Sequence, residues 1–112
     1  MKRVTVDDLP TEPLAAAGVF HQHWLPHIET ALAGGEDVLV AFAPADHTHR
    51  QWRLAAIAGL ARQYALCRAV AVSGEDAVID AFERYLSDAE AITGQYLEGD
   101  CVGAGDPLGR VS

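Results

Sequence analysis

Stretches typical of β-strands alternate with stretches typical of α-helices along this 112-residue chain. Most residues in 3–6, 37–42 and 67–72 are apolar or β-branched, and "QYLE" predicts a fourth strand. Between them, apolar residues recur at helical spacing over 14–33, 48–64 and 73–86. Strands that alternate with helices of this length are joined by crossovers and form a parallel sheet. We therefore predict an α/β, Rossmann-like fold, either three-layer or half-Rossmann (βαβαβαβ), with a small four-stranded parallel sheet and three helices.

The first predicted helix has start and stop signals. Thr11 is placed to cap it, Pro13 lies in its first turn, and the glycine pair at 34–35 ends it. Pro26 lies inside the helix and is expected to kink it, because proline lacks the backbone N–H of a helical residue.

The second and third helices differ in character. Asp46 or Thr48 is expected to cap the second helix, whose middle, "LAAIAGLA", is apolar nearly all round and built from small residues. Ser73 is expected to cap the third helix. A helix with small side chains allows a neighbouring backbone to approach closely, so helix 48–64 is a candidate contact surface.

The order of the strands bears on whether the chain acts alone. If they lie in the order 1-2-3-4, right-handed crossovers place all three helices on one face and leave the other bare. Yet "VLVAF" and "RAVAV" are apolar on both faces, and such a surface is seldom left to water. We expect a homodimer, or a complex with another protein, through the apolar sheet face, helix 48–64, or both. A strand order of 2-1-3-4 would remove this argument.

Charge and composition exclude several classes of protein. The 16 acidic residues exceed the 8 basic ones and give a net charge of −8, so nucleic acid and anionic membrane surfaces are not expected partners. No apolar stretch reaches the roughly 18 residues of a membrane span, and no signal peptide is expected, so we predict a cytoplasmic protein. Cys67 and Cys101 lack disulfide-framework spacing and are expected to be free thiols, Cys67 buried at a strand start. We predict one domain over 1–100 and a flexible tail over 101–112.

The segments "RLAAIAGLARQYALCRAVAVSG" and "AFERYLSDAEAITGQYLEGD" have a recognisable order. The first resembles the helix of short-chain dehydrogenases/reductases that contains K-A-A-L-x-G-L, together with the strand that follows it. The second resembles that family's ending, L-x-S-D-x-A-x-x-I-T-G-Q. The resemblance covers roughly 20–100, the C-terminal half of the family's fold. Its specific part is the ending, in which these residues match in order: Ser87, Asp88, Ile92, Thr93, Gly94 and Gln95.

The resemblance implies that the family's catalytic positions are vacant here. When Ala55 and Ala56 align with the alanine pair after the catalytic lysine, the lysine position holds Leu54 and the tyrosine position holds Arg50. Leucine has no proton to transfer, and a guanidinium stays protonated at working pH. The serine position, near "AFAPAD", holds no serine. We assign no catalytic, cofactor-binding or metal-binding residue, and expect no enzyme activity.

The family's cofactor turn is also not found. In the family a T-G-x-x-x-G-x-G turn carries the dinucleotide pyrophosphate, and we expect a truncated domain that begins after that turn. Gly99, Gly103 and Gly105 reproduce the glycine spacing near the end, but no helix follows them to receive a phosphate. We therefore expect no cofactor.

Histidines form the other group of candidate ligands. His21, His23 and His27 lie in the first helix, where the last two share a face at i, i+4. A metal would need a further ligand such as Asp46 or His47, and the alternative is that the histidines face solvent. Trp24 and Trp52 are expected to be core or interface anchors.

Two functions follow from these patterns. The first is a non-catalytic member of the dehydrogenase fold that acts as an interaction or scaffolding module. The alternative is a small-ligand or nucleotide-binding protein, or a diverged oxidoreductase, that uses the loop "APADHTHR" after the second strand. Its polar groups would be Asp46, His47, His49 and Arg50.

Overall fold

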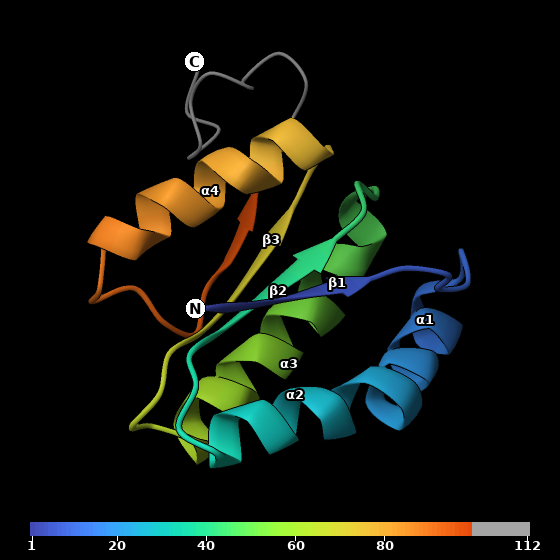
Figure 1. Cartoon of the computed structure of the whole chain (residues 1–112). Coiled ribbons are helices and arrows are strands. Elements are labelled where there is room, and N and C mark those ends of the chain that lie inside the picture. Colours follow the sequence, from blue (N-terminus) through green and yellow to red (C-terminus); the bar gives the residue numbers. More distant parts are fainter. Residues whose placement is uncertain (100–112) are drawn as a thin grey trace.

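The computed structural model describes residues 1–99, so Cys101 and the predicted tail 101–112 lie outside the described residues. Four strands alternate with helical segments in the predicted order (Figure 1). The strands are β1 (Lys2–Val6), β2 (Val38–Phe42), β3 (Ala69–Ser73) and β4 (Tyr96–Glu98). The α-helices are α1 (Pro13–Val19), α2 (Leu25–Ala33), α3 (Arg50–Gln63) and α4 (Asp76–Asp88). A π-helix, η1 (Phe20–Trp24), joins α1 to α2, and a 3₁₀ turn, η2 (His47–His49), precedes α3.

The four strands form one parallel sheet in the order β1-β2-β3-β4. Val4 lies beside Val40, which lies beside Ala71, which in turn lies beside Tyr96. Every residue of β2 and β3 is buried, as expected for the central strands of a covered parallel sheet. The predicted α/β fold with a small four-stranded parallel sheet is confirmed, and of the two strand orders considered the structure has 1-2-3-4.

Both faces of the sheet are covered, which makes the predicted bare face wrong. The segment from α1 to α2, together with α3, packs on one face, whereas α4 lies alone on the other (Figure 1). The first face carries Val40 and Ala71 in one hydrophobic cluster, and the second carries Leu39 and Val70 in another. Phe82 is the largest side chain that α4 adds to the second cluster. The fold is therefore a three-layer α/β/α arrangement.

The handedness of the third crossover explains the difference. All three crossovers step the chain in the same direction across the sheet, but the third helix lies on the opposite face. The β3-α4-β4 crossover thus has the opposite hand to the first two, against the strong general preference for one hand. The chain enters this crossover at Gly74, which has φ 153° and whose position would bring a Cβ to 2.8 Å from Val78 Cγ1. Only glycine fits such a turn.

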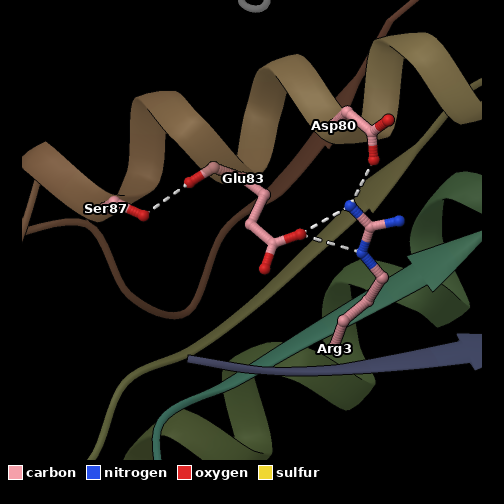
Figure 2. Close-up of polar contacts among 4 residues, drawn as sticks. All are labelled: Arg3, Asp80, Glu83 and Ser87. Atoms are coloured by element: carbon pink, nitrogen blue, oxygen red, sulfur yellow. Dashed lines mark hydrogen bonds and ion pairs between the residues drawn. The ribbon is translucent and has the colours of Figure 1, made fainter.

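An ion-pair cluster joins β1 to α4 across the second face (Figure 2). The Arg3 guanidinium donates to Asp80 Oδ1 at 2.6 Å and, through Nε, to Glu83 Oε1 at 2.9 Å. Ser87 Oγ donates to the Glu83 carbonyl one turn further along α4. These carboxylates raise the pKa of Arg3, first through the Asp80 hydrogen bond and then through that of Glu83. The part of this face nearest β1 is therefore covered by polar contacts.

The first predicted helix is interrupted earlier than Pro26. Leu25 N–H donates to the Phe20 carbonyl, five residues back, and this bond closes the π-helix η1. Pro26 follows at the start of α2, where its missing N–H leaves the carbonyl four residues earlier without a helical donor. A wider turn just before the proline accommodates that gap.

Two of the predicted helix caps are wrong and one is confirmed. Glu12, not Thr11, precedes α1, and Glu75, not Ser73, precedes α4. Ser73 instead ends β3 and is buried. Asp46 does cap the turn before α3, since its carboxylate accepts from Thr48 N–H at 3.0 Å.

The ending that resembles the dehydrogenase family fastens the last strand. Thr93 Oγ1 accepts from Ala69 N–H at 3.0 Å, and Gly94 N–H donates to the Ala69 carbonyl at 2.7 Å. Gly94 has φ 73°, a conformation that favours glycine. Nearby, Arg68 donates to the carbonyls of Leu86, Ala89 and Ile92, which terminate α4 and continue the chain toward β4. The matching residues therefore have structural roles.

Cys67 lies two residues before β3 rather than at its start, and it is half-buried. Its Sγ is 3.5 Å from the Leu32 carbonyl oxygen. The expectation of a buried cysteine is therefore only partly met.

Candidate functional site

A cavity of about 320 Å³ lies at the carboxyl ends of β1 and β2, the edge where open α/β sheets bind ligands. The segment after β1 forms one wall and the loop after β2 forms the other. Two buried residues, His49 at the end of η2 and Arg53 in the first turn of α3, also line it. The polar side chains at the cavity are those of Asp7, Asp8, Thr11, Asp46, His49 and Arg53.

Asp46 is exposed and held in place by its own turn. Its Oδ1 accepts from both the backbone N–H and the hydroxyl of Thr48. These bonds lower the pKa of Asp46, the bond from the Thr48 hydroxyl most and the bond from its backbone N–H next. The carboxylate therefore stays ionised and supplies a fixed negative charge at the cavity.

His49 uses both ring nitrogens inside the protein. Trp52 Nε1–H donates to His49 Nδ1 at 3.0 Å, so Nε2 carries the proton and donates to the Thr11 carbonyl at 3.0 Å. This pattern corresponds to a neutral imidazole. The predicted site residue His49 thus lines the cavity, but its hydrogen bonds make it a tie between η2 and the segment before α1.

Arg53 contributes a cation to the cavity. Its side chain is 4% exposed, and its guanidinium carbon lies 4.3 Å from the centre of the Phe42 ring. Nη1 donates to the Ala43 carbonyl at 3.2 Å and to Tyr96 Oη at 2.8 Å, whereas Nε is buried and has no partner within residues 1–99. Arg53 is therefore oriented by an aromatic ring and two neutral oxygens.

The other two predicted residues of the loop, His47 and Arg50, do not line this cavity. Arg50 begins α3 with an exposed side chain and donates through Nε to Glu98 Oε1 at 2.9 Å. Leu54, at the lysine position of the resemblance, is 44% exposed. Arg50 and Leu54 therefore point away from the cavity, while His49 and Arg53, one residue earlier and also four apart, line it.

As their spacing predicts, His23 and His27 lie on one face of the first helical segment and His21 lies on another. His23 and His27 line a second, open hollow together with Asp7 and Asp8. His21 lies elsewhere, and its Nδ1–H donates to the Ala17 carbonyl at 2.7 Å. Over residues 1–99, no three or more His, Cys, Asp or Glu side chains are grouped so that they could hold a metal ion.

The aromatic residues at the site form part of the core. Trp52 packs on Phe20 and Phe42, with ring centres 5.5 and 5.6 Å away. Trp24 is half-buried against the same cluster. The prediction that both tryptophans serve as anchors is confirmed.

The residues at this sheet edge do not fit a dinucleotide pyrophosphate. The turn between β1 and α1, "DDLPTEP", contains no glycine and brings the carboxylates of Asp7 and Asp8 to the cavity. Pro13, at the start of α1, has no N–H to offer a phosphate. Gly99 follows β4, but the other glycines of that spacing, Gly103 and Gly105, lie outside the described residues.

Arg53 is not among the residues predicted from the sequence, because it lies between the positions that align with the family's catalytic tyrosine and lysine, Arg50 and Leu54, and matches neither. One signal was available: a charged residue between Trp52 and Leu54, near the start of an otherwise apolar helix. A lysine or arginine is seldom fully buried without a partner, so its place in the helical period raises the question of what it binds.

Comparison with known proteins agrees with this architecture. The family described as short chain dehydrogenase-like protein (SDR-like) matches residues 4–99. No curated protein and no solved structure gives a significant match. Among the described residues, no helix has both the length and the apolar character needed to cross a membrane. The match spans most of the chain and all four strands, so this chain belongs to the short chain dehydrogenase-like family.

Proposed function

We propose that this protein is a non-catalytic member of its family and acts as an interaction module, as a homodimer. The observation that carries the proposal is where the structure places the residues at the family's catalytic tyrosine and lysine positions. Arg50, with a side chain 58% exposed, pairs with Glu98, and Leu54 faces outward on α3. The neighbouring His49 is tied through both ring nitrogens, which leaves neither free to exchange a proton with a substrate.

The outer surface of α3 is the contact surface we propose, since α4 covers the sheet face. Leu54 and Ala55 are exposed there, and Ala58 and Gly59 are half-buried. Leucine surrounded by small residues favours close packing of two helices. A second copy of the chain presents the same surface, as a two-fold symmetric dimer requires.

Light scattering tests the interface. We expect a mass twice that of one chain and expect Leu54→Glu to weaken the dimer at least about tenfold, because the new carboxylate would be desolvated in an apolar contact. Leu66→Glu is the matched control, since Leu66 is fully exposed outside α3. A monomeric wild-type protein, or equal effects of both substitutions, would count against this interface.

Titration with NAD(H) and NADP(H) tests the absence of the family's chemistry. We expect no rise in melting temperature and no oxidation of NADPH with a panel of aldehydes and ketones, because Asp7 and Asp8 repel a pyrophosphate at the sheet edge. An active short-chain dehydrogenase under the same conditions is the control. Saturable binding with a raised melting temperature would refute the proposal.

A second candidate function is small-ligand binding at the cavity. The observation that favours it is the meeting of Asp46 and His49, two of the four loop residues, with the buried Arg53 around one half-open cavity. Its volume of about 320 Å³ is at the lower end of the range typical of small-molecule sites.

A further inference from the structure

Arg53 has no acidic partner among residues 1–99. In this it differs from Arg3 and Arg50, which form ion pairs. Arg3 pairs with Asp80 and Glu83, and Arg50 pairs with Glu98, although all three pairs are at the surface. Arg53 is buried, so its charge has lost most of its hydration. Buried charges in proteins are normally paired, because desolvation alone is costly.

The bonds that Arg53 does make leave part of its hydrogen-bonding capacity unused. A guanidinium has five N–H groups, and the two bonds made within residues 1–99 both come from Nη1. Nε has no partner. The Phe42 ring, 4.3 Å away, stabilises the cation without supplying a negative charge. The guanidinium is thus held in place beside the cavity it lines, with donors left for a ligand.

A carboxylate is the anion that suits this arrangement. The planar fork of a guanidinium matches the two oxygens of a carboxylate, and such a pair is strongest where water is excluded. A phosphate has similar geometry but carries up to two negative charges. Three carboxylates, of Asp7, Asp8 and Asp46, line the same cavity and would repel a polyanion.

The same three carboxylates suit a positively charged group. Asp46 keeps its negative charge because its pKa is lowered, and His49 is held as a neutral imidazole, so it does not offset that charge. A ligand with one carboxylate and one ammonium group would therefore find a partner of opposite charge at each end.

We infer that the cavity binds a small zwitterion, with its carboxylate on Arg53 and its ammonium group facing Asp7, Asp8 and Asp46. This inference rests on the second candidate function and names its ligand class. It is independent of whether the chain forms a dimer through α3. The ligand is small, of the size of a free amino acid, because the cavity holds only about 320 Å³.

Matched sets of probes test the two charges separately. One set is γ-aminobutyrate with butyrate and n-butylamine, and the other is norleucine with hexanoate and n-pentylamine. Inorganic phosphate and NADPH complete the panel. Binding is followed by two-dimensional ¹H–¹⁵N NMR, in which the Trp52 indole N–H, bonded to His49, reports from the site. We expect one zwitterion to bind at least tenfold more tightly than either of its single-charge analogues.

Substitutions assign the binding to the site. Arg53→Met should weaken binding of the zwitterion at least tenfold, whereas Arg62→Met, on the exposed end of the same helix, should leave it unchanged. If Arg53→Met fails to fold, Arg53→Lys and the double variant Asp7→Asn, Asp8→Asn replace it. The lysine keeps the charge but lacks the fork, and the asparagine pair should reduce the advantage of the zwitterion over its carboxylate analogue at least threefold.

The outcomes distinguish the binding of a zwitterion from the binding of any small ligand at the cavity. Saturable binding of phosphate, NADPH or a single-charge probe in preference to the zwitterions would overturn the inference and keep ligand binding at the cavity. Zwitterion binding that survives the substitutions at Arg53 would also overturn it. No saturable shift with any probe would overturn both the inference and the second candidate function.

Discussion

Replacing Phe82 by alanine is expected to lower the free energy of unfolding by about 3 to 5 kcal/mol. Phe82 is 0% exposed and is the largest fully buried side chain of the hydrophobic cluster between α4 and the second face of the sheet. Its removal leaves a cavity against Leu39 and Val70, which the backbone of a parallel sheet cannot close. Since domains of this size are stable by only about 5 to 15 kcal/mol, a large part of the stability would be lost.

Urea unfolding followed by circular dichroism measures this effect. Leu14→Ala is the control, because Leu14 is 86% exposed on α1 and its truncation should change stability by less than about 0.5 kcal/mol. A loss below about 1 kcal/mol for Phe82→Ala would mean that α4 does not pack on this face, and the uncovered face expected from right-handed crossovers would again be the better description.

Replacing Arg68 by methionine is expected to cost about 2 to 3 kcal/mol, the scale of hydrogen bonds made by a charged donor. Arg68 Nη2 donates to the Leu86 carbonyl at 2.8 Å and the Ala89 carbonyl at 3.3 Å, and Nε donates to the Ile92 carbonyl at 3.3 Å. The carbonyls of Leu86 and Ala89 lie at the end of α4, where the helix dipole is negative, and that of Ile92 lies on the way to β4. Methionine keeps much of the side-chain length but leaves the three oxygens without this donor.

Unfolding experiments measure how much the Arg68 hydrogen bonds contribute to stability, and amide hydrogen exchange shows which residues they protect. We expect faster exchange over 86–98 in Arg68→Met, because the end of α4 and the approach to β4 lose their common support. Arg84→Met, on the exposed side of α4, is the control and should be neutral within about 0.5 kcal/mol. Equal stability and equal exchange in both variants would contradict the role given to Arg68.

Most of the secondary structure could be predicted from local patterns. The continuous apolar runs at β2 and β3 and the glycine pair after α2 act through backbone preferences and burial, which operate over a few residues. The side on which α4 lies could not be predicted in this way. The chain enters this crossover through a glycine turn at Gly74, and the general preference for right-handed crossovers predicts the opposite face.

The candidate site was predicted only in part for a similar reason. Asp46 and His49 reach the cavity because both follow β2, at the expected end of the sheet. His47 and Arg50 do not, since the orientation of α3 depends on the 3₁₀ turn η2, which advances more degrees per residue than an α-helix. That turn sets the helical phase so that Arg53, and not Leu54, lines the cavity.

The hydrogen bonds of Thr93 and Gly94 with Ala69 affect what can be concluded from the similarity of this segment to the dehydrogenase family. Those two residues belong to the segment most similar to the dehydrogenase family, yet their task is to join the final strand to its neighbour. Such a joint is needed whether or not a substrate is ever oxidised or reduced. The same ending can therefore occur in members of the family with and without catalytic activity. Similarity in this segment shows a shared architecture and does not show whether a reaction is catalysed.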